Sequence, residues 1–147
     1  MADESSRAAV SAARPSDRAA TDGVVWAGVW GAVIIGLAVA IGALGTHYLS
    51  GRIPMAREGT FDTAVRYQFV SGFGLVLLAA LSRGRAPRLL PAFQRAALSL
   101  ASGALLFCGS LYLLVAGGPS VLGAVAPLGG AAMILGWALL ALALRRT

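Results

Sequence analysis

Long uncharged apolar blocks, separated by short polar segments, dominate the pattern of residues along the chain. One block runs from Val24 to Leu44, another from Ala96 to Ala116, and the last from Val121 to Leu144. About 20 apolar residues, rising roughly 1.5 Å each, form a helix that spans the ~30 Å hydrocarbon layer of a bilayer. The pattern therefore predicts a membrane-spanning helix in each of these three ranges.

A shorter apolar block follows the first of these ranges. Its apolar residues run from Phe69 to Leu81, fewer than the roughly 17 that a span needs. A buried helix of a soluble domain would fit this length, but a chain with three other spans has no soluble core to hold it. An even number of spans also places the arginine-rich ends of the chain on one side. We therefore predict a second helix over residues 64–81, with Arg66 and Gln68 in its polar outer end.

The segment in front of this helix carries charges at helical spacing. Glu58, Asp62 and Arg66 are four residues apart, so on a helix they share one face, and Phe61 and Val65 lie on a neighbouring face. This arrangement is typical of an amphipathic helix that rests at the membrane interface or continues into the span. The sequence thus predicts an all-α integral membrane four-helix bundle, with spans at 24–44, 64–81, 96–116 and 121–144 and an amphipathic lead-in before the second span.

Composition supports membrane insertion and argues against nucleic acid as a partner. Hydrophobic residues make up 58% of the 147, charged residues make up 12%, and the mean hydropathy is +0.78. Soluble domains carry about 25% charged residues. The net charge of +6 comes from arginines that lie between apolar blocks, not in a basic patch with interleaved aromatics. Membrane lipids with anionic headgroups are therefore the expected partners of these residues.

The placement of the arginines predicts the orientation of the chain. Three lie in the N-terminal segment, four in the loop between helices two and three, and two at the C-terminal end, against Arg52, Arg57 and Arg66 on the opposite side. Arginine-rich loops remain in the cytoplasm, so both termini are expected there. Residues 1–23 are polar and lack apolar periodicity, which predicts a flexible cytoplasmic tail before a transmembrane domain over residues 24–147.

Small residues at four-residue spacing predict where the helices pack. Helices in lipid associate by close van der Waals contact, which glycine and alanine permit. The expected packing residues on helix one are Gly28, Ala32, Gly36 and Ala40, and those on helix four are Gly129, Gly130 and Gly136.

The candidate polar cluster lies around the start of helix two and consists of His47, Asp62, Arg66, Gln68 and Ser71. Ionisable groups at membrane depth are costly, which makes them candidates for function. Two interpretations of His47 remain open, namely a structural hydrogen bond at the interface and the handling of a proton or ligand. Asp62 and Arg66 are placed to pair, since burying one charge alone would cost more than burying both.

Other chemistry finds little support in the sequence. A single histidine and the lone Cys108 cannot supply a metal site or an intramolecular disulfide, so we expect no metal and no cofactor. No phosphate-binding glycine loop, nucleophile elbow or zinc-protease motif occurs, so no catalytic residues are predicted. Cys108 and Ser110 fit small packing positions within the third helix.

Four short motifs resemble the domain-of-unknown-function 423 family, which includes YgdD-type bacterial inner-membrane proteins and transmembrane protein 256. They are residues 42–47 (GALGTH), 61–68 (FDTAVRYQ), 109–112 (GSLY) and 122–130 (LGAVAPLGG) with Gly136 and Trp137. The resemblance covers roughly Val24 to Leu144 and implies a four-helix fold in the bacterial cytoplasmic membrane, without a known activity. The family often has Glu at the position of Asp62 and His at the position of Ser71, and the second difference weakens the case for metal or proton chemistry.

Two functions of different classes fit this sequence. The first is a non-enzymatic structural, assembly or accessory subunit of a larger membrane complex, with other membrane subunits or a second copy as its partner. The second is a small transporter or channel with His47, Asp62 and Arg66 at its outer mouth. The spans over 24–44, 96–116 and 121–144 lack the carboxylate that small exporters usually carry, which favours the first.

Overall fold

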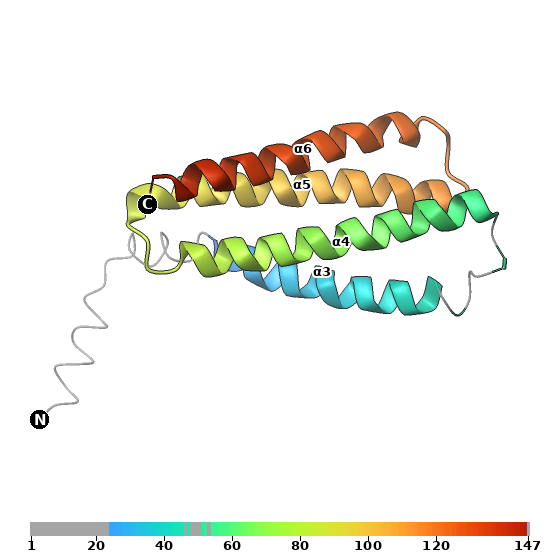
Figure 1. The fold of residues 1–147 in the computed structure, drawn as a ribbon, viewed down its shortest axis with the longest axis horizontal. Helices are drawn as coiled ribbons and strands as arrows, with labels where there is room; N and C mark the ends of the chain where they lie inside the picture. The colour runs from blue at the N-terminus through green and yellow to red at the C-terminus, as the bar shows by residue number, and fades with distance from the viewer. Residues whose placement is uncertain (1–23, 46, 48–50, 53, 147) are drawn as a thin grey trace, which may run out of the picture.

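A computed structural model of the chain describes residues 24–45, 47, 51–52 and 54–146 (Figure 1). These residues fold into four long helices, α3 (Val25–Leu44), α4 (Met55–Ser82), α5 (Leu90–Val115) and α6 (Leu122–Leu144), with a short 3-10 helix, η2 (Pro87–Leu89), before α5. All four long helices are apolar and long enough to cross a membrane. The predicted tail, residues 1–23, lies outside the described residues.

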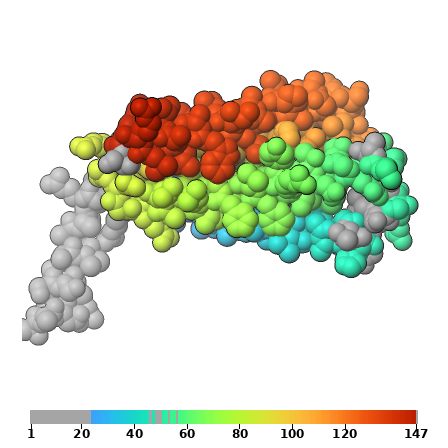
Figure 2. All heavy atoms as spheres, viewed as in Figure 1, coloured from blue at the N-terminus to red at the C-terminus, as the bar shows by residue number. Residues whose placement is uncertain are grey.

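The helices form a row that follows the order of the chain. Substantial contacts join α3 to α4, α4 to α5 and α5 to α6, whereas α3 and α6 share no contact of that size in the described residues. Successive helices run in opposite directions, so α3 begins at the end of the molecule where α6 ends (Figure 1). Figure 2 shows α4 along the middle of one face, between α6 and α3. The fold is therefore an up-and-down row whose first and last helices do not pack along their length.

The helix before the second span is continuous with it. The helix α4 starts at Met55, which agrees with one of the two arrangements that the sequence left open, in which the helical lead-in continues into the span over 64–81. The third helix starts at Leu90 instead of residue 96, because Gln94 and Arg95 are good helix formers and let the helix extend beyond its apolar block. The 28 residues of α4 rise about 42 Å, more than the ~30 Å hydrocarbon layer. Its first, polar turns therefore extend beyond the length that a span requires.

Glycines bring α5 and α6 together backbone to backbone. A Cβ atom added at Gly103 would lie 2.6 Å from the amide N of Met133, and Gly129 faces the backbone of α5 in the same way. Ser99 adds a hydrogen bond between the helices, donating from Oγ to the carbonyl O of Ala132 at 2.8 Å. In lipid, where water does not drive apolar surfaces together, such close contact holds helices in place.

The helices α3 and α4 approach each other at one pair of glycines. A Cβ atom at Gly31 would lie 2.7 Å from the carbonyl O of Gly72, and one at Gly72 would lie 3.0 Å from the carbonyl O of Gly31. Either substitution would push the two backbones apart. Gly31 and Gly72 are not among the packing residues that the small-residue spacing predicts.

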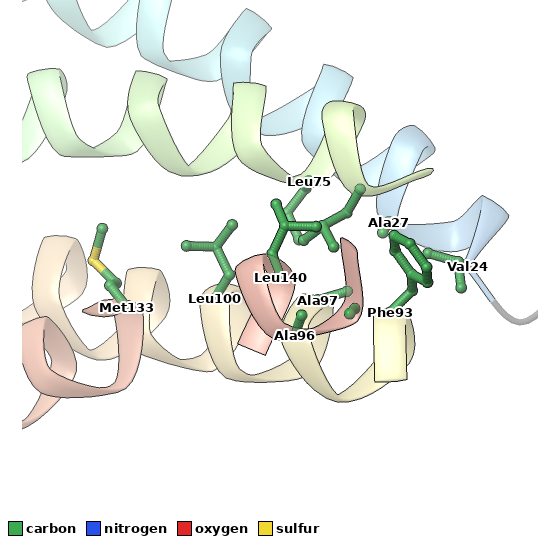
Figure 3. Close-up of a cluster of buried hydrophobic side chains, with 11 residues drawn as sticks. Val24, Ala27, Leu75, Phe93, Ala96, Ala97, Leu100, Met133 and Leu140 are labelled. Carbon is green, nitrogen blue, oxygen red and sulfur yellow. The ribbon is translucent and has the colours of Figure 1, made fainter. Parts of the chain in front are cut away.

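A cluster of buried hydrophobic side chains draws on all four helices and extends to the end of the molecule that holds the C-terminus. Phe93 of α5 is fully buried, with Val24 and Ala27 beside it in Figure 3. Leu140 and Ala143 of α6 belong to the same cluster. The N-terminal end of α3 is therefore joined to the rest of the row here, although α3 touches mainly α4 elsewhere.

Large apolar side chains cover the outside of the row. Leu105 is 76% exposed, Ile134 is 72% exposed and Val29 is 60% exposed. Exposed apolar surface on this scale requires a lipid environment or a partner. It agrees with four membrane-spanning helices.

Candidate functional site

The side chain of Gln68 connects three helices at the middle of α4. Its Nε2 donates a hydrogen bond of 3.0 Å to the carbonyl O of Ile34 on α3. Its Oε1 accepts a hydrogen bond of 2.6 Å from the hydroxyl of Tyr112 on α5. We call Ile34, Gln68 and Tyr112 the Gln68 bridge. Because no water competes for hydrogen bonds inside a bilayer, these bonds help set the spacing of α3, α4 and α5.

Helical periodicity explains why Gln68 points inward. The buried positions of α4 recur every three or four residues, and they include Ala64, Gln68, Ser71, Leu75 and Leu78. Gln68 is therefore part of the packing face of α4, where a polar side chain must find partners.

An aromatic contact lies beside the bridge. The ring of Phe61 on α4 meets the ring of Tyr112 edge to face, with 5.9 Å between the ring centroids. A Cβ atom at Gly45, just after α3, would clash with the Phe61 ring, so the ring lies directly against the backbone there. Phe61 thus packs between the end of α3 and Tyr112 and restricts the position of the tyrosine.

A cavity of about 260 Å³ opens beside the bridge, between α3 and α5. Gln68 and Tyr112 form its polar part, and its other lining residues, which include Ile41, Ala104 and Cys108, are small or apolar. The amide and hydroxyl of the bridge are already paired with each other and with α3. The cavity therefore suits a hydrocarbon chain or an apolar side chain better than an ion.

Two charged residues in the first turn of α4 bond to neighbouring segments on the side away from the C-terminus. Arg57, in the first turn of α4, donates a long hydrogen bond of 3.5 Å to the carbonyl O of Val115, the last residue of α5. A cation at this end of a helix is favoured by the helix dipole. Glu58 accepts a hydrogen bond of 3.2 Å from the backbone N of Gly51.

The residues of the predicted polar cluster do not meet at one place. His47, Asp62 and Arg66 are exposed, and among the described residues no ion pair joins Asp62 to Arg66. Ser71 is buried, and its Oγ donates to the carbonyl O of Tyr67 one turn earlier. Of the five predicted residues, Gln68 alone lines the cavity. No group of three metal-ligating side chains that could hold a metal ion occurs in the described part of the chain.

The predicted packing residues fall into two groups. On α6, Gly129 and Gly136 lie against the backbone of α5, and Gly130 touches the ring of Phe107. On α3, Gly28 approaches Ala79 of α4, but the remainder of the predicted stripe is exposed on the chain, namely Ala32, Gly36 and Ala40.

Tyr112 and Cys108 line the cavity. Tyr112 is not one of the site residues that the sequence predicts. A signal was present, because a tyrosine and a glutamine in neighbouring spans both need a hydrogen-bonding partner within the bilayer. Sequence spacing alone could not show that the two side chains face each other.

Known proteins match most of this chain. The family model described as "Protein of unknown function (DUF423)" matches residues 41–130. The UPF0382 membrane protein YwdK of Bacillus subtilis is 36% identical over 115 residues, which cover 78% of this chain and 92% of that protein. The UPF0382 inner membrane protein YgdD of Escherichia coli K12 is 33% identical over 102 residues, which cover 69% of this chain and 76% of that protein. No solved structure matches.

Proposed function

The chain belongs to the DUF423 family of membrane proteins of unknown function, and we propose that it is a non-enzymatic accessory or assembly subunit of a membrane complex. One observation carries this proposal. Ala32, Gly36 and Ala40 form a small-residue stripe on α3 that the contact with α4 leaves exposed. Small residues at this spacing let two helix backbones approach closely, so the stripe fits a helix of another subunit.

The low burial of α3 supports the same proposal. Only 17% of an apolar 18-residue stretch of α3 is buried inside the described structure, against 44% of the corresponding stretch of α4. No atom lies within 4 Å of a Cβ placed at Gly36, so a partner helix would meet no obstruction there. A helix at this position would cover the side of α3 that the row leaves open.

A transporter is not favoured by any described feature. His47, Asp62 and Arg66 are exposed, and they do not line the cavities described between the helices. The cavity beside the Gln68 bridge is mainly apolar, and its polar groups are bonded to each other. These features argue against a polar path that has Gln68 as a ligand.

The orientation is also part of the proposal. We place both termini in the cytoplasm, with the first turns of α4, Met55 to Asp62, as an amphipathic lead-in at the outer interface. The connection from α4 to α5, the first turns of α5 and the segment after α6 carry six arginines, and the turn between α5 and α6 carries none. This asymmetry supports the cytoplasmic assignment.

Site-specific photocrosslinking in intact cells tests the subunit role. A photoreactive amino acid at Gly36 or Ala40 should give a discrete crosslinked product with one other membrane protein. Ala131 and Ala138 are exposed on α6 and serve as matched positions that should give no such product. Products with a second copy of this chain alone, or equal and diffuse products from α3 and α6, would contradict an accessory role in a complex with another protein.

A further inference from the structure

A second cavity, of about 370 Å³, lies between α3 and α4 near the end of the molecule that holds the C-terminus. Val25 and Val29 of α3 and Val76 and Ala80 of α4 form its apolar walls, and Arg83 completes the lining. Arg83 directly follows Ser82, the last residue of α4, so its guanidinium lies where the spanning helix ends. We call this cavity the Arg83 groove.

Small residues keep the groove open. Gly28 and Ala79 meet at its base, where a Cβ at Gly28 would lie 3.0 Å from the Cβ of Ala79. The two helices are close there, and no larger side chain fills the space above them. A helix about 10 Å across occupies roughly 400 Å³ per turn, so the groove of about 370 Å³ admits less than one turn of a partner helix but can hold a thinner hydrocarbon chain.

The charge around the mouth of the groove is positive. Arg88, Arg95, Arg145 and Arg146 lie at the same end of the row, in the connection from α4 to α5, the first turns of α5 and the segment after α6. The two acidic residues of the described chain, Glu58 and Asp62, lie in the first turns of α4, at the opposite end. An anion at this end therefore meets no described carboxylate.

The side chain of Arg83, unlike that of Arg85, is positioned to bind a ligand in the groove. Arg85 donates from Nε to the carbonyl O of Leu81 at 3.1 Å, so its side chain is turned back onto the end of α4. The side chain of Arg83 is exposed beside the groove. The N-terminal end of α3 borders the same groove at Val25 and has no side-chain cap, so its dipole adds positive potential.

We propose that the Arg83 groove binds one anionic phospholipid, with its phosphate at Arg83 and an acyl chain between Val29 and Val76. An apolar groove between two spanning helices, with an exposed guanidinium at the end of one of them, matches both parts of such a lipid. This binding site is independent of the subunit role proposed above.

Native mass spectrometry of the delipidated, full-length protein in detergent tests this site. The probes are dioleoyl phosphatidylglycerol and dioleoyl phosphatidylcholine, which share acyl chains and differ in charge. We expect one tight adduct with the anionic lipid and weaker binding of the neutral one. Arg83→Gln should lower the affinity for phosphatidylglycerol about fivefold, and the matched change Arg95→Gln, at the same end but outside the groove, should leave it within about twofold.

A second pair of variants tests the apolar part. Ala80→Leu fills the groove from an exposed position and should reduce binding of both lipids, whereas Ala138→Leu on the outside of α6 should not. Equal losses in Arg83→Gln and Arg95→Gln would overturn the proposal in favour of diffuse attraction to the basic end. Displacement of the lipid by millimolar inorganic phosphate would also overturn it, because a phosphate site would then need no acyl chain.

Discussion

The hydroxyl of Tyr112 on α5 donates a hydrogen bond of 2.6 Å to the side-chain oxygen of Gln68 on α4. The same glutamine donates to α3, so one side chain ties together the first three spans. The cavity beside it gains its polar part from this pair. Loss of either partner should therefore affect the spacing of the helices and not only one contact.

Removing the hydroxyl should weaken the fold by a measurable amount. Tyr112→Phe leaves Oε1 of Gln68 without its partner, and hydrogen bonds between membrane helices contribute about 0.6 kcal/mol on average and at most about 1.7. We expect a loss in this range in the free energy of unfolding, measured by SDS titration in mixed micelles with circular dichroism. Tyr67→Phe is the matched control, because Tyr67 makes a ring contact with Phe107 at 5.1 Å that does not use the hydroxyl. Equal losses in the two variants would show that the bond contributes nothing.

Replacing both polar groups should be less harmful than the sum of the single changes. Gln68→Met keeps the volume of the side chain but leaves the hydroxyl of Tyr112 unpaired, and adding Tyr112→Phe removes that unpaired group. A double-mutant cycle with the same unfolding assay should therefore give a coupling energy of about 0.5 kcal/mol or more. Strict additivity would contradict a direct bond between the two residues.

The approach of α5 to α6 should depend on Gly103 far more than on Gly109. A methyl group at Gly103 would meet the backbone of α6 at Met133, whereas nothing lies within 4 Å of one at Gly109. Gly103→Ala should lower the free energy of unfolding by about 1 to 3 kcal/mol through overpacking. Gly109→Ala, on the same helix, should leave it unchanged or raise it by up to about 1 kcal/mol through better helix propensity. Similar effects of the two changes in SDS titration would refute this contact.

The exposed charges of α4 should matter little for stability. Asp62 and Arg66 are both exposed, and exposed charges typically contribute well under 1 kcal/mol. We expect Asp62→Asn and Arg66→Gln each to change the free energy of unfolding by less than about 0.5 kcal/mol. A loss of more than about 2 kcal/mol in either variant would instead indicate that these charges are buried when the protein is in its membrane.

Cysteine labelling checks the proposed orientation. In a Cys108→Ser background, Ser120→Cys lies in the exposed turn between α5 and α6, and Ala86→Cys lies in the exposed connection before η2. With both termini in the cytoplasm, an impermeant maleimide should label Ser120→Cys in intact cells and Ala86→Cys only after permeabilisation. The reverse pattern would invert the orientation, and labelling of both in intact cells would contradict a crossing by α5.

The number and positions of the spans followed from the sequence because they depend on local hydropathy and length. Three uncharged blocks matched the thickness of a bilayer, and the structure has a long helix in each. The second span was more difficult because Arg66 and Gln68 interrupt its apolar pattern. The structure shows one helix from Met55, directly after Pro54, so the charged lead-in and the apolar block form a single element.

The candidate site shows the limit of such reasoning. The sequence indicated that Gln68 lies in the polar end of a span, but the same logic grouped it with His47, Asp62 and Arg66, which face outward. Its true partner, Tyr112, is 44 residues away along the chain. The spacing of small residues on the first helix likewise did not show which face packs against α4, since Gly31 makes a close contact with α4 and Gly36 makes none.

By itself, the sequence determined that this chain is an all-helical membrane protein with four spans and an excess of arginine at one end, because these properties depend on the summed hydropathy and charge of contiguous segments. The tertiary structure decided which face of each helix is buried, and with it the Gln68 bridge and the Arg83 groove. The physical reason is that apolar residues surround nearly every helix of a membrane protein. Hydrophobicity therefore cannot distinguish the face that packs from the face that meets lipid, and the close fit of small residues makes that choice.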